Sequence, residues 1–186
     1  EVGAASGSGN LVIEAVHVMK QFNGKVLFRD MSTRIMRGDR VAIVGPNAVG
    51  KTSLLRVLIG DLLPDEGSVQ MGTHLETIYF DQRRKSLDHN QTLWQTICPN
   101  GGDMVNVQGR LQHVTGYLRK FLFDDRQMKS PVTSLSGGEK NRLLLARLFS
   151  HSGNLLALDE PTNDLDLETM DLLTEMLTNY KGTLLI

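Results

Sequence analysis

The chain has 186 residues, of which 40% are hydrophobic and 5% aromatic, and its formal net charge is −1. This length suits one domain with a sizeable core, and the near-neutral charge excludes a globally basic nucleic-acid-binding protein. A single cysteine, Cys98, excludes an internal disulfide, and no apolar stretch approaches the ~18–20 residues of a membrane span, so we expect a cytoplasmic protein without membrane partners.

The first ten residues differ in composition from the rest of the chain. Residues 1–10 are rich in Gly, Ala and Ser, which predicts a flexible linker or connector, with a cloning remnant as the alternative. Residues 11–18 and 33–37 are predicted to form strands of an antiparallel subsheet. The folded domain is therefore expected to span residues 11–186.

A glycine-rich loop between a predicted strand and a predicted helix is the first motif that indicates a chemistry. Residues 40–44 form a β-branched run typical of a buried parallel strand, and residues 53–59 have a helical pattern that stops at Gly60. The backbone N–H groups of the loop, at a helix N-terminus, are predicted to wrap the phosphates of a bound nucleotide. The loop matches G-x-x-x-x-G-K-[ST] and consists of Gly45, Pro46, Asn47, Ala48, Val49, Gly50, Lys51 and Thr52.

The last residues of this loop have separate predicted roles. Lys51 is expected to reach the β- and γ-phosphates, the Thr52 hydroxyl to bind Mg²⁺, and Ser53 to contact the α-phosphate. The alternative, a simple glycine turn between strand and helix, does not explain why Lys and Thr follow Gly50. We therefore favour a nucleotide-binding loop.

Residues 83–135 are predicted to form a mainly helical subdomain, because they show no sheet alternation. Trp94, Tyr117, Phe121 and Phe123 occur there at helix-like spacings, which favours core packing over a base-stacking platform. The run that follows, Ser136, Gly137 and Gly138, offers a hydroxyl and closely spaced N–H groups at a helix start. It is predicted to be a second phosphate cradle.

Two adjacent acids follow the most apolar run of the chain. Residues 155–158 read Leu-Leu-Ala-Leu, which predicts a buried strand that ends at Asp159 and Glu160. Since successive strand residues point to opposite faces, Asp159 is predicted to hold Mg²⁺ and Glu160 to orient or deprotonate the attacking water. The alternative is that the acids only cap a strand-to-turn junction.

A later apolar stripe predicts a helix packed against the sheet, with Leu172, Leu173, Met176 and Leu177.

The run Leu-Ser-Gly-Gly-Glu at 135–139 and the helical pattern at 140–149 resemble the signature of the ABC ATPase superfamily. The resemblance extends from about Leu11 to the last residue. It implies an α/β fold of the P-loop NTPase type, with a mainly parallel core sheet, an antiparallel β subsheet and a helical subdomain. In ABC proteins the signature reaches the nucleotide held by an opposing domain. The resemblance therefore implies that Ser136, Gly137 and Gly138 serve a site shared by two domains.

The same resemblance implies roles for residues outside the loop. Phe22 resembles the A-loop aromatic that stacks on adenine, and Gln82 resembles the Q-loop glutamine that contacts Mg²⁺ and the attacking water. Residues 163–166 look like the D-loop, which contacts the partner domain. The implied ligands are ATP and Mg²⁺. The implied metal-binding residues are Thr52, Gln82 and Asp159, and the implied catalytic residues are Glu160 and Gln82.

Residues 161–166, Pro-Thr-Asn-Asp-Leu-Asp, resemble the ABC-F subfamily, whose members carry two fused ATPase domains and no membrane part. Residues 104–123 resemble the second of those domains. The implied partner is a second ABC ATPase domain of the same polypeptide or, alternatively, a homodimer mate. The resemblance further implies action on ribosomes, rRNA or ribosome assembly, with branched DNA as another partner, through regions outside this chain.

Three departures from the family pattern affect the expected activity. Ala48 stands where most members have Gly or Ser, and Phe22 replaces the more usual Tyr. The chain ends at residues 183–186, before the Ser-His-Asp switch, so the switch histidine is missing. We therefore expect weak ATP binding and negligible hydrolysis from this chain alone.

Several alternatives remain open at this point. A membrane transporter motor is disfavoured by residues 161–166, and a clamp that barely hydrolyses is disfavoured by Glu160 and Gln82. The basic run at 83–85 is better explained as a solvated loop than as a contact for RNA phosphate. The five histidines show no metal-ligand spacing, at His17, His74, His89, His113 and His151.

Overall fold

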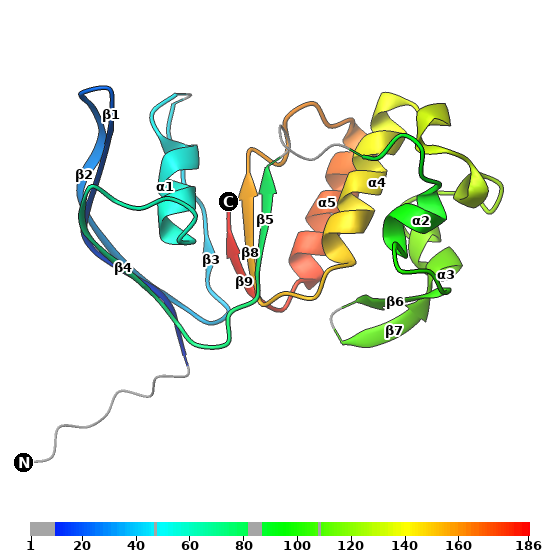
Figure 1. The fold of residues 1–186 in the computed structure, drawn as a ribbon, viewed down its shortest axis with the longest axis horizontal. Coiled ribbons are helices and arrows are strands. Elements are labelled where there is room, and N and C mark those ends of the chain that lie inside the picture. The colour runs from blue at the N-terminus through cyan, green and yellow to red at the C-terminus, as the bar shows by residue number, and fades with distance from the viewer. Residues whose placement is uncertain (1–9, 47, 82–86, 108) are drawn as a thin grey trace, which may run out of the picture. The chain divides into compact units, whose positions relative to one another are not determined.

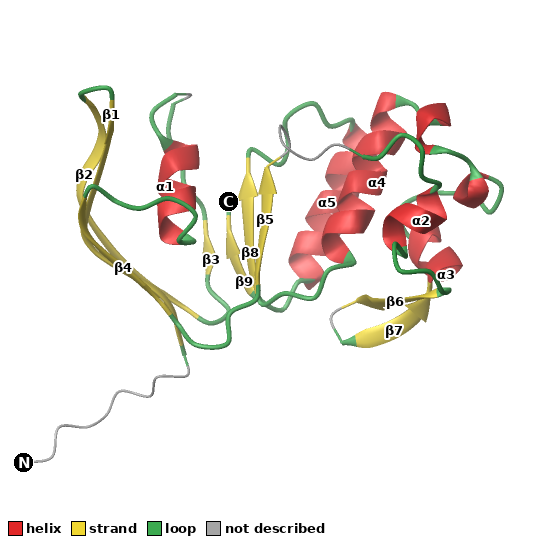
Figure 2. Cartoon of the chain, viewed as in Figure 1, coloured by secondary structure: helices red, strands yellow, loops and turns green. Residues whose placement is uncertain are grey.

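The computed structural model describes residues 10–46, 48–81, 87–107 and 109–186, which form two compact units. The first unit takes the chain up to Phe80 and adds residues 153–161 and 181–186. The second unit takes residues 81–152 and 162–180. Figure 1 labels the helices and strands of both units, and Figure 2 separates the strands from the helices by colour.

An antiparallel sheet with strand order β2-β1-β4 forms one part of the first unit. Its strands are β1 (Leu11–Phe22), β2 (Lys25–Met36) and β4 (Glu66–Met71). The two-residue turn between β1 and β2 has positive φ at both Asn23 and Gly24, a conformation that these two residue types favour. The predicted antiparallel subsheet is therefore confirmed, although both strands extend well beyond residues 11–18 and 33–37.

A second sheet in this unit has the order β3-β9-β8-β5, with β9 parallel to both β3 and β8. Its strands are β3 (Arg40–Val41), β5 (Thr77–Asp81), β8 (Leu155–Asp159) and β9 (Thr183–Leu185). Residues 155–158 are all buried, as their continuous apolar run predicted. The strand predicted at 40–44 is too long, because only Arg40 and Val41 pair with β9 in a regular ladder.

Helix α1 (Lys51–Leu58) packs on the core of the first unit. Leu55 and Leu58 project from it into a cluster that includes Val12 and Ile13 of β1 and Leu155 of β8. The helix ends at Leu58, and Gly60, two residues later, has φ of +78°; the Asp61 N–H donates to the Arg56 carbonyl. The helix predicted at 53–59 therefore exists, but it begins two residues earlier, at Lys51.

The longest helices of the second unit are α4 (Gly137–Phe149) and α5 (Leu167–Asn179), which pack against each other. Leu172 and Leu173 form the buried part of the predicted apolar stripe on α5. The shorter helices are α2 (Leu93–Ile97), α3 (Val114–Arg119), η1 (Gln127–Lys129) and η2 (Val132–Ser134). The predicted aromatic core is confirmed for three of its four members, since Tyr117, Phe121 and Phe123 are at most 2% exposed, whereas Trp94 is half-buried.

A hairpin interrupts the helices of the second unit. It consists of β6 (Met104–Val107) and β7 (Arg110–His113), which pair antiparallel. The hairpin was not predicted, because the sequence of this segment shows no sheet alternation. Each strand has only four residues, which is too short for a period of two to be separated from chance.

Candidate functional site

The start of α1 forms a loop that only glycine can close. Gly50 is the N-cap residue with φ of +107°, a backbone conformation that side chains disfavour. A Cβ at this position would lie 3.0 Å from the Cβ of Leu27, which projects from β2 against the loop. Ala48 also has positive φ, at +62°. The loop therefore bends tightly, and its backbone can approach a ligand at the N-terminus of α1 closely.

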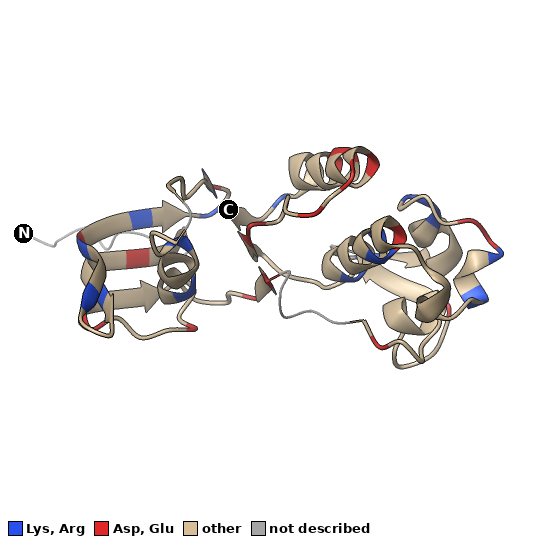
Figure 3. Cartoon of the chain, turned by 90° about the horizontal axis from the view of Figure 1, so that it is seen from above, with Lys and Arg blue, Asp and Glu red and all other residues tan. Residues whose placement is uncertain are grey.

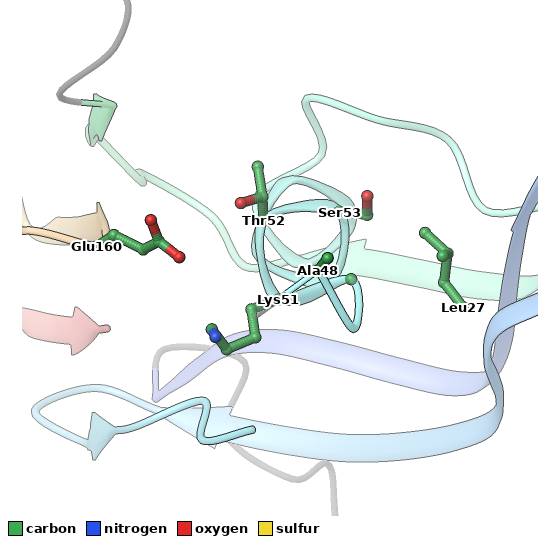
Figure 4. A pocket seen from close by; sticks show the side chains of 7 residues that line it. Leu27, Ala48, Lys51, Thr52, Ser53 and Glu160 are labelled. Atoms are coloured by element: carbon green, nitrogen blue, oxygen red, sulfur yellow. The ribbon is translucent and has the colours of Figure 1, made fainter. Parts of the chain in front are cut away.

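A pocket of about 240 Å³ lies at this end of the helix. Figure 4 shows its lining, with the Glu160 side chain reaching toward Thr52 from the other side of the pocket. The pocket is formed within the first unit. Its lining residues are Leu27, Ala48, Gly50, Lys51, Thr52, Ser53 and Glu160.

The first turn of α1 provides a positive environment for an anion. Among the described residues no side chain caps the helix N-terminus, and its first turn contains no acidic residue. The Lys51 ammonium donates to the carbonyls of Gly45 at 2.9 Å and Pro46 at 3.1 Å, so the cation is held across the loop. The orphan N–H groups and dipole of the helix end add to this charge. These features suit the binding of a phosphate group.

The acidic pair lies at the end of β8, as predicted from the sequence. Asp159 is the last residue of the strand, and Glu160 follows it with φ of +49°. A non-glycine residue in this conformation is uncommon and tends to occur at functional sites. Both acids are half-buried, and Glu160 lines the pocket that also contains Lys51 and Thr52. The structure therefore brings the N-terminus of α1, with its lysine and hydroxyl, together with the Glu160 carboxylate. Lys51 and Glu160 are 109 residues apart in the sequence.

The donor atoms at this site fit a magnesium nucleotide. Mg²⁺ binds oxygen ligands, and the Thr52 hydroxyl and the Glu160 carboxylate line the pocket. Asp159, the predicted metal-binding acid, is not among the lining residues and ends β8 next to Glu160. The loop at Gly50 is a cradle that a Cβ would partly fill, so the backbone can approach phosphates closely. Lys51 and the N-terminus of α1 would hold the phosphates.

The residues of the predicted second cradle begin α4 in the second unit. Ser136 is the N-cap, and its hydroxyl accepts a hydrogen bond from the Glu139 N–H at 3.3 Å. The Glu139 carboxylate accepts in return from the Ser136 N–H at 2.7 Å, which completes a capping box. The hydrogen bond from the Ser136 N–H to the Glu139 carboxylate is the main cause that holds the pKa of Glu139 below its usual range. A hydrogen bond from the Ser136 hydroxyl to the same carboxylate is the next cause. The helix end is therefore stabilised by the chain itself.

Contacts between α4 and the start of α5 constrain this second cradle further. Gly138 lies against Asp166, because a Cβ at Gly138 would be 2.2 Å from the Asp166 Oδ2. Asp166 caps α5 by accepting from the Thr169 N–H at 2.8 Å. The Asn141 side-chain amide donates to the Asp164 carbonyl at 3.0 Å, which ties the predicted D-loop to α4. The signature and the D-loop therefore form one packed structure.

Comparison with known proteins decides the family. The family model described as ABC transporter matches residues 28–163, which is more than half of the chain. The chain belongs to the ABC family. The loop at 45–52, the acidic pair after β8 and the signature at 135–139 all fall within the matched range or at its edge.

Curated relatives refine this assignment within the ABC family. ATP-binding protein Uup of Caulobacter vibrioides is 52% identical over 185 residues, which cover 100% of this chain and 30% of that protein. Energy-dependent translational throttle protein EttA of Mycobacterium tuberculosis is 40% identical over 174 residues, 94% of this chain and 31% of that protein. These relatives confirm the predicted resemblance to the ABC-F subfamily. The chain spans less than one third of the length of either protein.

Solved structures agree with the ABC ATPase fold. The ATP-binding subunit of an ABC transporter aligns with a TM-score of 0.71 at 21% identity, covering 94% of this chain and 78% of that one. At this identity the likeness shows the fold alone, and the predicted fold class is confirmed. Within the residues that the structure describes, none of the helices is both long and apolar enough to cross a membrane.

Some residues that the sequence analysis singled out lie outside the described residues, and one residue that lines the pocket was not predicted. Asn47, Gln82 and the basic run at 83–85 lie outside the described residues. Phe22 lies at the tip of the β1–β2 hairpin and is 48% exposed. Leu27, which lines the pocket, was not predicted. The Asn23-Gly24 pair is a strong hairpin signal and could have shown that Phe22 and the start of β2 lie close together.

Proposed function

We propose that this chain is an ATP-binding domain that hydrolyses ATP together with a second ABC domain. One observation supports this most strongly: the N-terminus of α1, Lys51, Thr52 and Glu160 converge on a single pocket. An anion-binding helix end and a carboxylate in one site suit phosphoryl transfer to water, which depends mainly on positioning and charge neutralisation. The curated relatives named ATP-binding proteins also support it.

Each residue of the site has a proposed role in this reaction. Lys51 and the backbone of the loop hold the phosphates, Ser53 contacts the α-phosphate, and Thr52 and Asp159 hold Mg²⁺. When bound, Mg²⁺ neutralises charge on the phosphate oxygens. Glu160 orients the attacking water and accepts its proton. Gln82, which lies outside the described residues, is proposed to contact the same water and the metal.

The second cradle is proposed to act on another domain. Ser136, Gly137 and Gly138 would contact the nucleotide held by an opposing ABC domain, which is either part of the same polypeptide or a second copy. The Ser136 hydroxyl would donate to that nucleotide in place of its hydrogen bond to the Glu139 carboxylate, while it still accepts from the Glu139 N–H. Hydrolysis would then need both domains, and one domain alone would be nearly inactive.

Hydrolysis can be tested in a polypeptide that joins this chain to a second ABC domain. Replacement of Glu160 by Gln is expected to lower phosphate release about a hundredfold, within the range for loss of a general base, and to leave ATP binding intact. Replacement of Ser136 by Ala should lower hydrolysis without lowering ATP binding at the loop of the same domain. Unchanged phosphate release by the Glu160→Gln variant would contradict the catalytic assignment.

We further propose that the ATP cycle acts in the cytoplasm on ribosomes or on ribosome assembly. The Mycobacterium tuberculosis relative is named for energy-dependent throttling of translation, which supports this proposal. The Glu160→Gln two-domain protein should accumulate in its ATP-bound form, so cell lysate with ATP can be fractionated on a sucrose gradient. ATP-dependent sedimentation with ribosomal particles is the expected result. Recovery on membranes or on DNA, without ribosomal particles, would overturn this proposal but leave the ATPase assignment intact.

A further inference from the structure

Lys20 is a buried cation at the end of β1. Its residue is only 8% exposed, whereas lysine is seldom buried unless it is paired. The ammonium donates to the Leu63 carbonyl and to the Asp65 Oδ1, both at 2.9 Å. This pair differs from the Arg34–Glu14 pair on the same sheet, whose arginine is 68% exposed. Figure 3 shows that both signs of charge occur on the strands of this sheet.

Asp65 fastens the segment before β4 to the same end of β1. Its Oδ2 accepts from the Gln21 N–H at 2.8 Å, and its own N–H donates to the Met19 carbonyl at 2.9 Å. The Gln21 N–H and then the Lys20 ammonium hold the pKa of Asp65 below its usual range, so the carboxylate is ionised at neutral pH. Lys20 is therefore held between two fixed acceptors.

The same ammonium lies 5.3 Å from the centroid of the Phe22 ring, within the range of a cation–π contact. The contact occupies one face of the ring. Phe22 nevertheless keeps 48% of its surface exposed. A second flat group can therefore stack on the remaining face.

Phe22 lies a few residues along the chain from a residue that lines the nucleotide pocket. Phe22 pairs with Lys25, and Leu27 lies two residues further along β2, where the register shifts between the pair Gln21 and Val26 and the pair Lys20 and Phe28. Leu27 lines the pocket and contacts the loop at Gly50. The aromatic ring and the phosphate site are therefore joined by one short strand segment.

We propose that the Lys20–Asp65 pair is a positioning device for nucleotide binding, in which Lys20 holds one face of Phe22 and leaves the other for the base. This inference rests on the proposed ATP-binding function and adds two positioning residues to it. Stacking tolerates any base, because every base has a π-face. Loss of Lys20 should therefore weaken the binding of ATP and GTP by the same factor, and should leave the binding of tripolyphosphate unchanged.

The test is a set of competition titrations on this 186-residue chain, with Mg-ATP, Mg-GTP and Mg-tripolyphosphate displacing a fluorescent nucleotide. Phe22→Ala should weaken ATP binding about tenfold, within the range for loss of one stacked base. Lys20→Met should weaken it about threefold, since it removes only the contact that orients the ring. Lys20→Arg should restore part of the loss, and Arg34→Met, which removes the exposed ion pair on the same sheet, should have no effect.

A double-mutant cycle separates a positioning role from a merely structural one. If Lys20 acts through Phe22, Lys20→Met in the Phe22→Ala background should cause no further loss of ATP affinity. Equal weakening of ATP and tripolyphosphate, or unchanged ATP affinity in the Lys20→Met variant, would overturn the inference. Asp65→Asn provides a second, milder variant of the pair if Lys20→Met lowers the unfolding midpoint. If Lys51→Ala binds ATP as tightly as the parent, the proposed function fails and not this inference alone.

Discussion

Two glycine-containing motifs precede helices in this chain, and the two helix ends differ in what satisfies them. Helix α1 begins at Gly50 without a side-chain cap among the described residues, and its first turn has no acid. Helix α4 begins at Ser136, whose side chain and Glu139 close a capping box. Both ends carry the positive pole of a helix dipole. The α1 end is also bordered by a pocket that contains a lysine.

This difference in capping shows that a glycine-rich helix start is not by itself a phosphate site. At α1 no side chain of the described residues caps the helix, whereas at α4 the chain provides its own carboxylate. In the proposed mechanism α1 binds a nucleotide within its own domain, and α4 contributes through Ser136 to a nucleotide held elsewhere. Four substitutions probe this contrast.

The largest effect is expected at Lys51. Lys51→Ala removes the cation that is held across the loop, and we expect ATP affinity to fall about a hundredfold, as for loss of one partner in a close charge pair. Ser136→Ala in the same chain should leave ATP affinity unchanged. Both can be measured by competition titration. Equal losses from the two substitutions would remove the contrast between the helix ends.

Gly50→Ala should be the next most damaging change. The positive φ and the contact with Leu27 at 3.0 Å predict a loss of about 1–3 kcal/mol in the free energy of unfolding, together with weaker ATP binding. Chemical denaturation measures the first effect. Gly60→Ala is a useful comparison, because Gly60 also has positive φ (+78°) but no atom near the added Cβ. If the two variants lose equal stability, the close approach of the added Cβ to Leu27 does not contribute to the loss of stability in Gly50→Ala.

At the other helix end, Gly138→Ala should destabilise the chain by about 1–2 kcal/mol, because the new methyl group would collide with Asp166. Gly137→Ala is the matched control. No atom lies within 4 Å of the added Cβ there, so this change should be neutral or slightly stabilising. The expected order of unfolding midpoints is Gly137→Ala above or equal to the parent, and Gly138→Ala below it. The reverse order would contradict the packing of α4 on the start of α5.

The smallest effect concerns the charge of Glu139. Since hydrogen bonds lower the folded-state pKa of Glu139 below its reference value of 4.5, its stabilisation is complete well above that pH and is lost as pH falls through the folded-state value. Glu139→Gln should therefore cost about 0.5 kcal/mol at pH 7, and the difference from the parent should shrink as pH falls through the folded-state pKa of Glu139. Urea denaturation at pH 7 and at a series of lower pH values tests this. A difference that persists at low pH would show that charge is not its cause.

Features encoded in contiguous residues were predictable from the sequence. The loop with α1 and the acids at the end of β8 each form a local pattern, and Lys51, Thr52 and Glu160, which these patterns contain, line one pocket. Leu27 was not predicted, because its place in the pocket depends on how a separate hairpin packs on the loop. The capping box of Ser136 and Glu139 was also not predicted, although its S-x-x-E pattern is contiguous in the sequence.

Strand boundaries were less predictable, because they depend on partners that are distant in sequence. The strand expected at 40–44 ends at Val41, which pairs with Leu185 of β9 (Thr183–Leu185). Ile43 still donates to the Ile186 carbonyl at 2.6 Å, outside the regular ladder. The β6–β7 hairpin was not predicted for a different reason. Its strands are too short to show the alternation of polar and apolar residues that indicates a strand.

We expect the α1 helix end, and not the α4 helix end, to bind the nucleotide phosphates within this chain. A titration of the ¹⁵N-labelled chain with Mg-ATP, followed by backbone amide NMR at low protein concentration, distinguishes the two helix ends. The amide signals of Ala48, Gly50, Lys51 and Thr52 should shift first and saturate together, while those of Ser136 to Glu139 do not move. Shifts that begin at Ser136 to Glu139, or a loop whose signals ignore ATP, would contradict it.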